Sequence, residues 1–532
     1  MENKRSKIII VISILLLIFT IATILSIMLK HNNVSDIAYE ENNILASDIS
    51  NKYEDIDYGE EKEINSDLTI SEGGIYSLSG EYECIKVASN DNVRIILNNA
   101  SIKCSNGPAI NVLSSDILNI RLVGNNTLES KTSSSLDGAI YSKSDLYFDG
   151  EGVLNITSNY DGIVSKDSLI IKEGNYIINS SGDGIKGKDS VSIVGGNYNI
   201  TSLSDGIKSS NDEEEDKGFI VIDGGVFDIN SKNDGIQAST TLYINNGVFN
   251  IKTLDGYLSK TNEDISAKGI KADKQIIIKS GTFDINSYDD SIHSNENISI
   301  YNGVFDIKTS DDAIHADSTL KIINGSINII ESSEGLEASS IEINGGSIIV
   351  KAYDDAINAN GNDSNEEKTK TSKFTNMNGK ITITGGEIDL LSYGDALDCN
   401  GNIEIKGGKV YIQSQNNMAD SPLDHNGTFY ISGGEFISIG NIGAHDNGEI
   451  LSSIPMLIVT LNEKQSGDVK ISNISYTPKI NNYRQVIIAS TKLKPSSTYT
   501  LITGNTKTDV TLAESGITTY GNTQNEHGRP NN

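Results

Sequence analysis

The sequence lacks several features that define common classes of protein. Its 532 residues include no tryptophan, six prolines and three cysteines, which excludes a disulfide-rich scaffold. Basic residues are scarce, because 42 lysines and arginines face 72 aspartates and glutamates and give a formal net charge of -30. A nucleic-acid binder needs a basic face to neutralise phosphates, so the composition predicts no nucleic-acid partner. It favours metal cations as partners instead.

One long apolar run is present, at the N-terminus. Lys4, Arg5 and Lys7 precede residues 8–29, which carry no charge over 22 residues. About 20 such residues span a bilayer core, and no small-x-small cleavage site follows. Residues 1–30 are therefore predicted to be an uncleaved signal anchor, a transmembrane helix with its basic end inside. The alternative is a cleaved signal peptide. The rest of the chain is then a cell-surface ectodomain, or a secreted protein if cleavage occurs.

Composition divides the remaining chain into four parts. Residues 31–65 are acidic, rich in asparagine and without apolar periodicity, and are predicted to be a disordered spacer. Residues 66–454 carry a repeat. Residues 455–505 alternate strand-like runs with turns and predict a small antiparallel β cap that covers the open end of the repeat. Residues 506–532 are predicted to be a disordered tail.

The repeat in residues 66–454 has a period of about 22 residues. Each unit has a short alternating strand, a Gly-Gly or Asn-Gly pair, a second strand, and an acid followed mostly by Gly-Ile or Ala-Ile. Stacking such units pairs every strand in parallel and buries one side of each. The sequence therefore predicts an all-β fold, a right-handed parallel β-helix, as a monomer. The motif acids are Asp137, Asp161, Asp183, Asp205, Asp234, Asp290, Asp312, Glu334, Asp355 and Asp395.

Stacking converts the spacing into columns of side chains about 4.8 Å apart. The residue three positions after the motif acid forms a column that changes from basic to acidic: Lys186, Lys208, Gln237, Lys271, His293, His315, Glu337, Asn358 and Asp398. Stacked carboxylates repel one another, and Ca²⁺ relieves the repulsion with six to eight oxygen ligands. Zn²⁺ is disfavoured, because the cluster of acids contains no cysteine and only two histidines. The predicted Ca²⁺ ligands are Asp289, Asp290, Asp311, Asp312, Glu334, Glu337, Asp354, Asp355, Asp395 and Asp398.

Some of these acids also have a structural interpretation, since Asp commonly accepts backbone N–H bonds at turns. We prefer that interpretation for isolated acids such as Asp161 and Asp183, and a metal for the doubled acids from Asp289 to Asp355. Lys271 lies one coil before the doubled acids. It is either an exposed lysine that pairs with them or the base of a Ca²⁺-dependent lyase, which takes the proton alpha to a uronate carboxylate.

Three tyrosines and two histidines are candidate substrate contacts. Tyr288, Tyr353 and Tyr393 each lie two residues before a motif acid and share a column, where they stack either on sugar rings or on one another at the corner of the coil. His293 and His315 align one coil apart. They are predicted to form a polar ladder on the solvent face, with a catalytic or metal pair as the alternative.

The cysteines allow two arrangements. Cys84 and Cys104 lie 20 residues apart, about one coil, so they form either a disulfide or two buried thiols. Cys399 is predicted to be an unpaired, partly buried residue.

Together the acidic motifs resemble those of a known family. Ser-Gly-Asp-Gly-Ile-Lys at 181–186, Asp-Ser-Ile-His at 290–293, Asp-Ala-Ile-His at 312–315 and Asp-Ala-Leu-Asp at 395–398 carry the likeness. They resemble bacterial carbohydrate-binding domain-containing β-helix proteins over about residues 66–505. The resemblance implies a right-handed parallel β-helix, bound Ca²⁺, binding of cellulose or acidic pectic polysaccharide, and a fold relation to Ca²⁺-dependent pectate lyases. In the final coil, Ser421 replaces the motif acid.

The sequence therefore predicts an extracellular, membrane-anchored and Ca²⁺-dependent polysaccharide-binding protein. One alternative is a polysaccharide lyase with Lys271 as its base. The other is a structural surface rod or adhesin without a sugar site.

Overall fold

The structure, a computed structural model, describes residues 44–64, 68–131, 138–259, 265–361, 378–415, 420–442 and 448–521. All of these except Ile44 belong to one structural unit, residues 45–532. The predicted signal anchor, residues 1–30, lies outside the described residues. Within the described ranges, no helix is long and apolar enough to cross a membrane.

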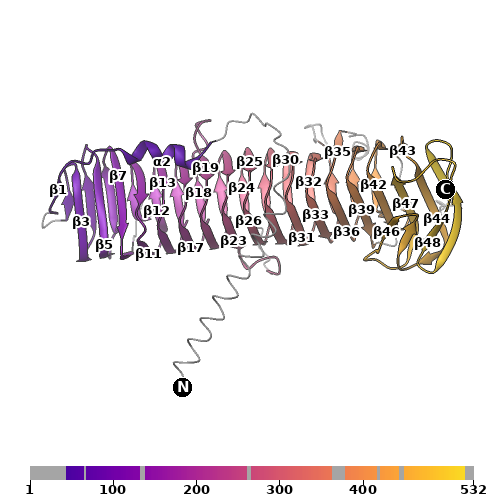
Figure 1. The fold of residues 1–532 in the computed structure, drawn as a ribbon. Coiled ribbons are helices and arrows are strands. Elements are labelled where there is room, and N and C mark those ends of the chain that lie inside the picture. The colour runs from indigo at the N-terminus through magenta and orange to yellow at the C-terminus, as the bar shows by residue number, and fades with distance from the viewer. Residues whose placement is uncertain are drawn as a thin grey trace, which may run out of the picture. The chain divides into compact units, whose positions relative to one another are not determined.

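Strands of this unit repeat in groups of three, and a strand pairs in parallel with the strand three places further along (Figure 1). Strand β14 (Asn175–Ser180) pairs with β17 (Asn197–Ser202), and Asn175 lies opposite Asn197, which is 22 residues later. The predicted all-β fold of stacked parallel repeats is confirmed. We call this part, from β1 to β43, the coil stack. Its handedness stays a prediction.

The strands of the coil stack form three rows. β30 (Ile314–Ile322) and β32 (Leu336–Ile343) each run through rows B and C, whereas β3 (Gly74–Tyr82) and β5 (Val93–Cys104) each run through rows C and A. Row A follows the glycine pair: β8 (Asn125–Ser130), β11 (Val153–Ser158), β14, β17, β20 (Val226–Ser231), β23 (Val248–Thr253), β26 (Thr282–Ser287), β29 (Val304–Thr309), β31 (Ser326–Ser332), β33 (Ser347–Ala352), β36 (Glu387–Ser392), β39 (Lys409–Ser414) and β42 (Glu435–Gly440). Row B follows the motif acid: β2 (Thr69–Ile70), β4 (Ile85–Ala88), β6 (Ile110–Ser114), β9 (Gly138–Ser142), β12 (Asp161–Ser165), β15 (Ile185–Gly187), β18 (Ile207–Ser209), β21 (Ile236–Ala238), β24 (Ile270–Ala272), β27 (Ile292–Ser294), β34 (Ile357–Ala359), β37 (Leu397–Cys399) and β40 (Leu423–His425). Row C precedes the glycine pair: β1 (Glu61–Lys62), β3 (Gly74–Tyr82), β5 (Val93–Cys104), β7 (Ile117–Val123), β10 (Asp145–Asp149), β13 (Ser168–Ile171), β16 (Ser190–Ile193), β19 (Phe219–Ile222), β22 (Thr241–Ile244), β25 (Gln275–Ile278), β28 (Asn297–Ile300), β35 (Gly379–Ile383), β38 (Gly401–Ile405), β41 (Thr428–Ile431) and β43 (Glu449–Ser452).

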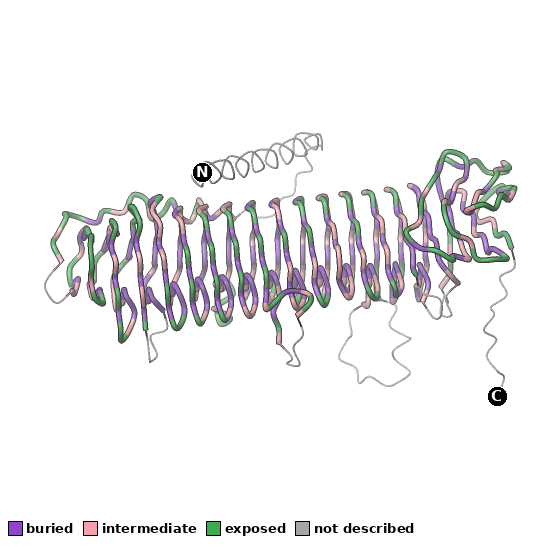
Figure 2. Tube along the Cα trace, turned by 90° about the horizontal axis from the view of Figure 1, so that it is seen from below, coloured by how far each residue is buried: buried purple, intermediate pink, exposed green. Residues whose placement is uncertain are grey.

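Alternating side chains build the core between the rows. In β17 the buried positions are Tyr198, Ile200 and Ser202, and the residues between them are exposed. Figure 2 shows this alternation repeated from coil to coil. Successive coils place aromatic rings on top of one another, with ring centroids 4.5–5.1 Å apart, along Tyr176, Tyr198, Phe227, Phe249, Phe283 and Phe305.

Two close contacts explain the glycine pairs. Gly247 has a φ of +145°, and a Cβ atom there would lie 2.7 Å from Cε2 of Phe249, so a side chain would displace the ring that follows it. Gly346, which precedes Ile348 and no ring, has a φ of +91°, and a Cβ atom there would lie 2.7 Å from the backbone oxygen of Gly325 in the preceding coil.

The predicted disordered spacer is wrong for residues 44–64. Helix α2 (Ala46–Glu54) lies along the coil stack, as Figure 1 shows. Its first backbone N–H groups, of Ala46 and Ser47, donate to the carboxylate of Asp223 at 2.9 and 2.8 Å. Tyr53 stacks on Tyr147 with ring centroids 5.6 Å apart. The helix depends on partners about 90–180 residues away, which local periodicity does not reveal.

The C-terminal part combines two antiparallel arrangements. Strand β47 (Tyr483–Ser490) pairs with β42 and with β44 (Met456–Gln465), and a separate sheet contains β45 (Val469–Ile471), β46 (Ile474–Tyr476), β48 (Thr498–Thr503) and β49 (Thr506–Thr511). Strand β50 (Ile517–Tyr520) pairs in parallel with β44. The predicted disordered tail is therefore wrong for residues 506–521. The partners of β50 lie far away in the sequence, and a short polar segment carries no pattern that predicts such pairing.

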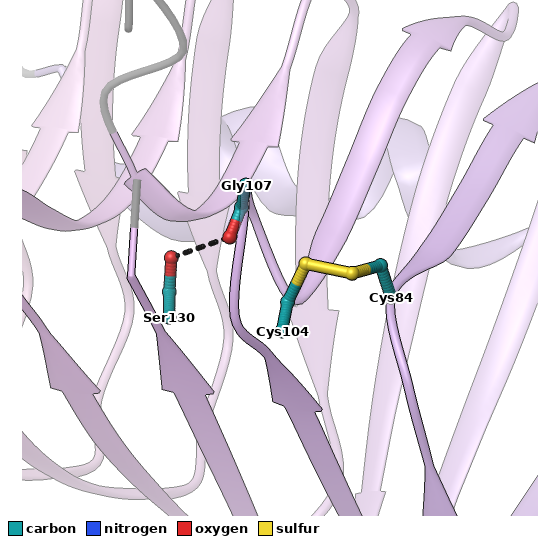
Figure 3. Close-up of a disulfide and its surroundings, with 4 residues drawn as sticks. All are labelled: Cys84, Cys104, Gly107 and Ser130. Carbon is teal, nitrogen blue, oxygen red and sulfur yellow. Dashed lines mark hydrogen bonds between the residues drawn. A yellow bond between two sulfur atoms is a disulfide. The ribbon is translucent and has the colours of Figure 1, made fainter. Parts of the chain in front are cut away.

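Cys84 and Cys104 form a disulfide (Figure 3), which decides between the two predicted arrangements. It joins the turn before β4 to the end of β5. Cys399 is a buried free thiol.

Candidate functional site

The motif acids lie in the turn between rows A and B, and they cap that turn. In five of them, one carboxylate oxygen accepts the backbone N–H of the next motif acid along the chain. The N···O distances are 2.7 Å for Asp183 to Asp161, 3.1 Å for Asp205 to Asp183, 3.0 Å for Asp234 to Asp205, 3.2 Å for Asp312 to Asp290 and 2.7 Å for Asp395 to Asp355. The acids therefore have a structural role in both halves of the stack. The two halves differ in the partner of the second carboxylate oxygen.

The column three residues after the acid has the predicted register. Its members lie side by side on successive row B strands in the order Lys186, Lys208, Gln237, Lys271, His293, His315, Glu337, Asn358, Asp398 and Asp424. We call this column the ladder. Asp424, in the last coil, extends it beyond the predicted metal ligands.

Lysines neutralise the acids in the N-terminal coils. Nζ of Lys186 lies 2.7 Å from Oδ2 of Asp183, and Nζ of Lys208 lies 2.6 Å from Oδ2 of Asp205. Both carboxylates are buried. Burial opposes ionisation of Asp183, but Lys186 outweighs it and lowers the pKa of that carboxyl. At Asp205 the lysine does not outweigh burial: burial and the charge of Asp183 keep the pKa of that carboxyl above its ordinary value despite Lys208.

In the middle coils Lys268, and not the predicted Lys271, contacts the doubled acids. Nζ of Lys268 lies 2.9 Å from Oδ1 of Asp289 and 2.6 Å from Oδ2 of Asp290. The sequence held a signal for this contact, because Lys268 precedes Gly269-Ile270 and so stands at the motif-acid position. Lys271 lies in the ladder between Gln237 and His293. Charge pairing with two acids raises the pKa of Lys268 despite its burial.

The two predicted histidines approach the same carboxylate. Nδ1 of His293 lies 2.8 Å from Oδ2 of Asp290, and Nδ1 of His315 lies 3.7 Å from it. Burial opposes ionisation of Asp290, but its contacts with His293 and His315 and the charge of Lys268 outweigh that effect and hold its pKa well below the usual range. The histidine rings meet edge to face, with centroids 4.9 Å apart.

The C-terminal coils hold acids with raised pKa values. Burial and the charge of Glu337 raise the pKa of Glu334 to about 7. Burial and the charge of Asp398 raise the pKa of Asp355 to about 8. Burial, together with the charges of neighbouring acids, raises the pKa of Asp395 to about 9 and that of Asp398 to about 6. Carboxylate oxygens of Asp395, Asp398 and Asp424 lie within 4.8 Å of one another.

An amide oxygen joins these acids. Nδ2 of Asn358 donates to Oε2 of Glu334 at 2.9 Å. Oδ1 of Asn358 is buried and has no hydrogen-bond partner among the described residues. Asn358 lies between Glu337 and Asp398 in the ladder. This oxygen and its acidic neighbours form the set of ligands that Ca²⁺ prefers, namely carboxylates and amide carbonyls.

Of the remaining predicted metal ligands, Asp312 belongs to the same electrostatic group. Burial, a hydrogen bond to the Glu337 carboxyl and the charge of Asp290 raise the pKa of Asp312 to about 10. Asp311 and Asp354 are exposed, and Asp289 is half-buried. Oxygens of Asp289, Asp290 and Asp311 lie within 4.8 Å of one another, where Lys268 already supplies a positive charge.

The three predicted tyrosines do not form one continuous platform. Tyr353 and Tyr393 stack on each other with centroids 5.7 Å apart, and they are 60% and 40% exposed. Tyr288 is half-buried and lines a separate hollow of about 410 Å³ with Asp289, Ser310 and Asp311. The stacked tyrosines lie two residues before Asp355 and Asp395, so exposed rings and acids with raised pKa values occupy the same part of the stack.

The fold and this face define a repeat protein of stacked parallel coils with a graded polar ladder. Residues 64–313 and 311–511 match the family model described as "Carbohydrate-binding domain-containing protein". The chain belongs to this family, which confirms the resemblance noted in the sequence.

One solved structure is similar to part of the chain. It is described as "Structure of the polysaccharide lyase-like protein from C. thermocellum, Gadolinium derivative". It is 27% identical, covers 39% of this chain and 85% of that chain, and has a TM-score of 0.35. Comparison with curated protein sequences gave no match.

Proposed function

We propose that the protein is an extracellular, Ca²⁺-dependent polysaccharide-binding β-helix that recognises plant cell-wall glycans such as polygalacturonate or cellulose. The observation that carries the proposal is a group of half-buried acids with raised carboxyl pKa values, Glu334, Asp355, Asp395 and Asp398, beside an amide oxygen of Asn358 that has no hydrogen-bond partner among the described residues. Family membership supports a carbohydrate as the ligand.

Ca²⁺ suits this group by charge and by donor type. The residues that would hold it are Glu334, Glu337, Asp355, Asp395 and Asp398, with Asn358 and Asp424 as additional oxygen donors. Buried carboxylates this close together must otherwise retain protons. A bound divalent ion replaces those protons, and a hard cation with variable coordination tolerates the irregular spacing of the acids better than Mg²⁺ does. The secondary candidates are Asp289, Asp311 and Asp354. Asp289 already forms an ion pair with Lys268, and the other two are exposed to solvent.

The sugar is expected beside Tyr353 and Tyr393. Exposed aromatic rings offer apolar surface to the C–H faces of a sugar ring. A Ca²⁺ ion on the adjoining acids presents free coordination positions to a uronate carboxylate. An acidic protein then binds an acidic polymer only when the metal links them, which explains how a chain of charge -30 takes such a ligand.

The location of the protein is part of the same proposal. Disulfides persist in oxidising environments outside the cytosol, so the Cys84–Cys104 bond supports an extracellular position. The apolar residues 8–29 supply the proposed membrane anchor. We also propose that the coil stack is right-handed, as parallel crossovers generally are.

A pull-down of the full-length protein on polygalacturonate and on cellulose, with Ca²⁺ or with EDTA, tests the proposal. We expect retention with Ca²⁺, no retention with EDTA, and no unsaturated uronate in the supernatant. Asp395→Asn should lose retention, whereas Asp183→Asn, in a coil neutralised by Lys186, should keep it. Unsaturated products would assign the protein to the lyases instead. Absence of retention in both conditions would refute polysaccharide binding.

A further inference from the structure

The histidines of the ladder form a second kind of cation site. We propose that His293 and His315, together with Asp290, bind a divalent transition-metal ion of the Zn²⁺ class, with water as the fourth ligand. This site differs from the proposed Ca²⁺ site in its nitrogen ligands, and it does not depend on polysaccharide binding.

The first argument is the state of His293. The ring is buried, with 9% of its surface exposed. Its Nε2 lies 3.0 Å from Oδ1 of Asn295, whose Nδ2 points to Asp273 at 3.5 Å, so the amide oxygen faces the ring. Nε2 of His293 therefore has an oxygen partner outside the cluster. Its Nδ1 faces the acids of the cluster. Among the described residues it has no hydrogen-bond partner, although Oδ2 of Asp290 lies 2.8 Å away.

The second argument is the surroundings of His315. Three carboxylate oxygens lie near its Nδ1: Oδ2 of Asp312 at 3.4 Å, Oε2 of Glu337 at 3.6 Å and Oδ2 of Asp290 at 3.7 Å. These distances exceed those of a good hydrogen bond. Ligand atoms around a tetrahedral Zn²⁺ ion, at bond lengths of about 2.0–2.1 Å, lie about 3.3–3.4 Å apart. The separations of 2.8–3.7 Å bracket that value.

The outer contacts of both rings match those of metal-binding histidines. A metal-bound histidine usually donates its other N–H to a carboxylate, carbonyl or water, which fixes the tautomer. Nε2 of His293 faces Asn295, and Nε2 of His315 lies 3.5 Å from Oδ1 of Asp317. Both rings thus turn Nδ1 toward the acids and Nε2 toward an outer oxygen.

The donor types of the cluster suit a Zn²⁺-class ion, because imidazole nitrogens and a carboxylate oxygen are among the ligands that Zn²⁺ accepts. Oδ2 of Asp290 also lies 2.6 Å from Nζ of Lys268. The sequence disfavoured Zn²⁺ because two histidines are too few. The turn-capping Asp290 completes a set of three ligands whose atoms lie within 4.8 Å of one another.

Titration of the metal-free, full-length protein with Co²⁺ and Zn²⁺ tests the inference. We expect one Co²⁺ ion with the intense visible absorption of tetrahedral coordination, displaced by a stoichiometric amount of Zn²⁺ but not by Ca²⁺. His293→Asn and His315→Asn should each weaken Zn²⁺ binding at least 100-fold. Lys271→Asn, the preceding residue of the ladder, is the matched control and should leave it unchanged.

Two further variants keep the test decisive. Asn295 is exposed, so Asn295→Ala should fold normally and still weaken Zn²⁺ binding by about 10-fold through loss of the outer contact. Asp398→Asn should impair Ca²⁺ binding and leave the Co²⁺ spectrum intact, which separates this site from the polysaccharide proposal. Absence of a tetrahedral Co²⁺ spectrum would overturn the inference, as would equal Zn²⁺ affinity in the wild type and both histidine variants. His293 and His315 would then be a simple ion-paired ladder.

Discussion

Two pairs of coils have the same kind of turn but carry different charges. One pair is around Asp183 and Asp205, and the other is around Asp355 and Asp395. In both pairs a carboxylate oxygen accepts the backbone N–H of the next coil. In the first pair Lys186 and Lys208 occupy the second oxygen. In the second pair the ladder residues are amide or acid, Asn358 and Asp398. The difference teaches that the acid belongs to the fold, and that the residue three positions later decides whether it also needs a cation.

The effect on ionisation follows from this difference. Lys186 lowers the pKa of Asp183, whereas burial and neighbouring carboxylates raise the pKa of Asp355 to about 8 and that of Asp395 to about 9. In the N-terminal coils a lysine lies against the second oxygen of Asp183 and of Asp205, although the pKa of Asp205 stays raised. In the C-terminal coils no lysine takes that ladder position, and this difference is the reason that we propose them as the metal-binding part of the stack.

Removing a ladder lysine should have the largest effect. Lys208→Met leaves Asp205 buried without its ammonium partner, and breaking such a pair costs about 3 kcal/mol of unfolding free energy. Denaturant unfolding monitored by circular dichroism measures the loss. Lys188→Met is the control, because Lys188 contacts the exposed Glu213 at 4.0 Å and such pairs contribute about 0–1 kcal/mol. Equal losses in the two variants would show that the ladder lysines do not neutralise the column.

Transferring the N-terminal arrangement to the C-terminal coils should abolish metal binding there. Asp398→Lys places an ammonium beside Asp395, as Lys186 stands beside Asp183, and supplies internally the charge that we assign to Ca²⁺. We expect Ca²⁺ affinity to fall by about 100-fold, or about 2.8 kcal/mol, in calorimetric titration. The thermal stability of the Ca²⁺-free protein should not fall. Unchanged Ca²⁺ affinity would place the ion elsewhere.

The pH dependence of stability should have opposite signs for the C-terminal acids with raised pKa values and for Asp183, whose pKa is lowered. Glu334, Asp355 and Asp395 have pKa values of about 7, 8 and 9, above those of the unfolded chain, so the folded state binds more protons. Their contribution is complete below about pH 4 and is lost as the pH rises toward 9. Asp183, with a lowered pKa, contributes above that range and loses its contribution on acidification.

Calorimetry in EDTA measures this dependence. We expect the Tm of the Ca²⁺-free protein to fall between pH 5 and pH 9 by a few degrees, since roughly 2–4 °C corresponds to 1 kcal/mol in a domain of 150–250 residues. Excess Ca²⁺ should remove most of the fall. A Tm that rises over this range without Ca²⁺ would contradict the raised pKa values.

Most of the fold was predictable because the repeat is local. A 22-residue period fixes the register of every row. The spacing alone therefore predicts that Lys186, His293, Glu337 and Asp398 lie in one ladder. What it missed depends on contacts between distant segments. Helix α2 packs through Asp223 and Tyr147, and β50 pairs with β44. The residues of helix α2 and of strand β50 contain no sequence pattern that predicts these contacts.

The candidate site was predictable as columns but not as contacts. Spacing cannot show that Lys268 pairs with Asp290 in the next coil. Nor can it show that one carboxylate oxygen of an acid such as Asp290 accepts a backbone N–H. Nor can it show that Tyr288 lines its own hollow while Tyr353 and Tyr393 stack in the open. Side-chain direction within a turn depends on the packing of the neighbouring coils, which a periodic pattern leaves undetermined.

The smallest expected effect concerns the aromatic surface beside the acids. Tyr393→Ala removes an exposed ring that we assign to the sugar, and loss of such a contact costs about 1 kcal/mol, or roughly fivefold in polygalacturonate affinity. Tyr160→Ala is a matched control, because Tyr160 is 39% exposed, as Tyr393 is 40% exposed, but precedes Asp161 in the lysine-neutralised half. Affinity electrophoresis with Ca²⁺ compares the two variants. If both lost affinity equally, sugar binding would extend along the whole stack, and the division between the two halves would concern the metal alone.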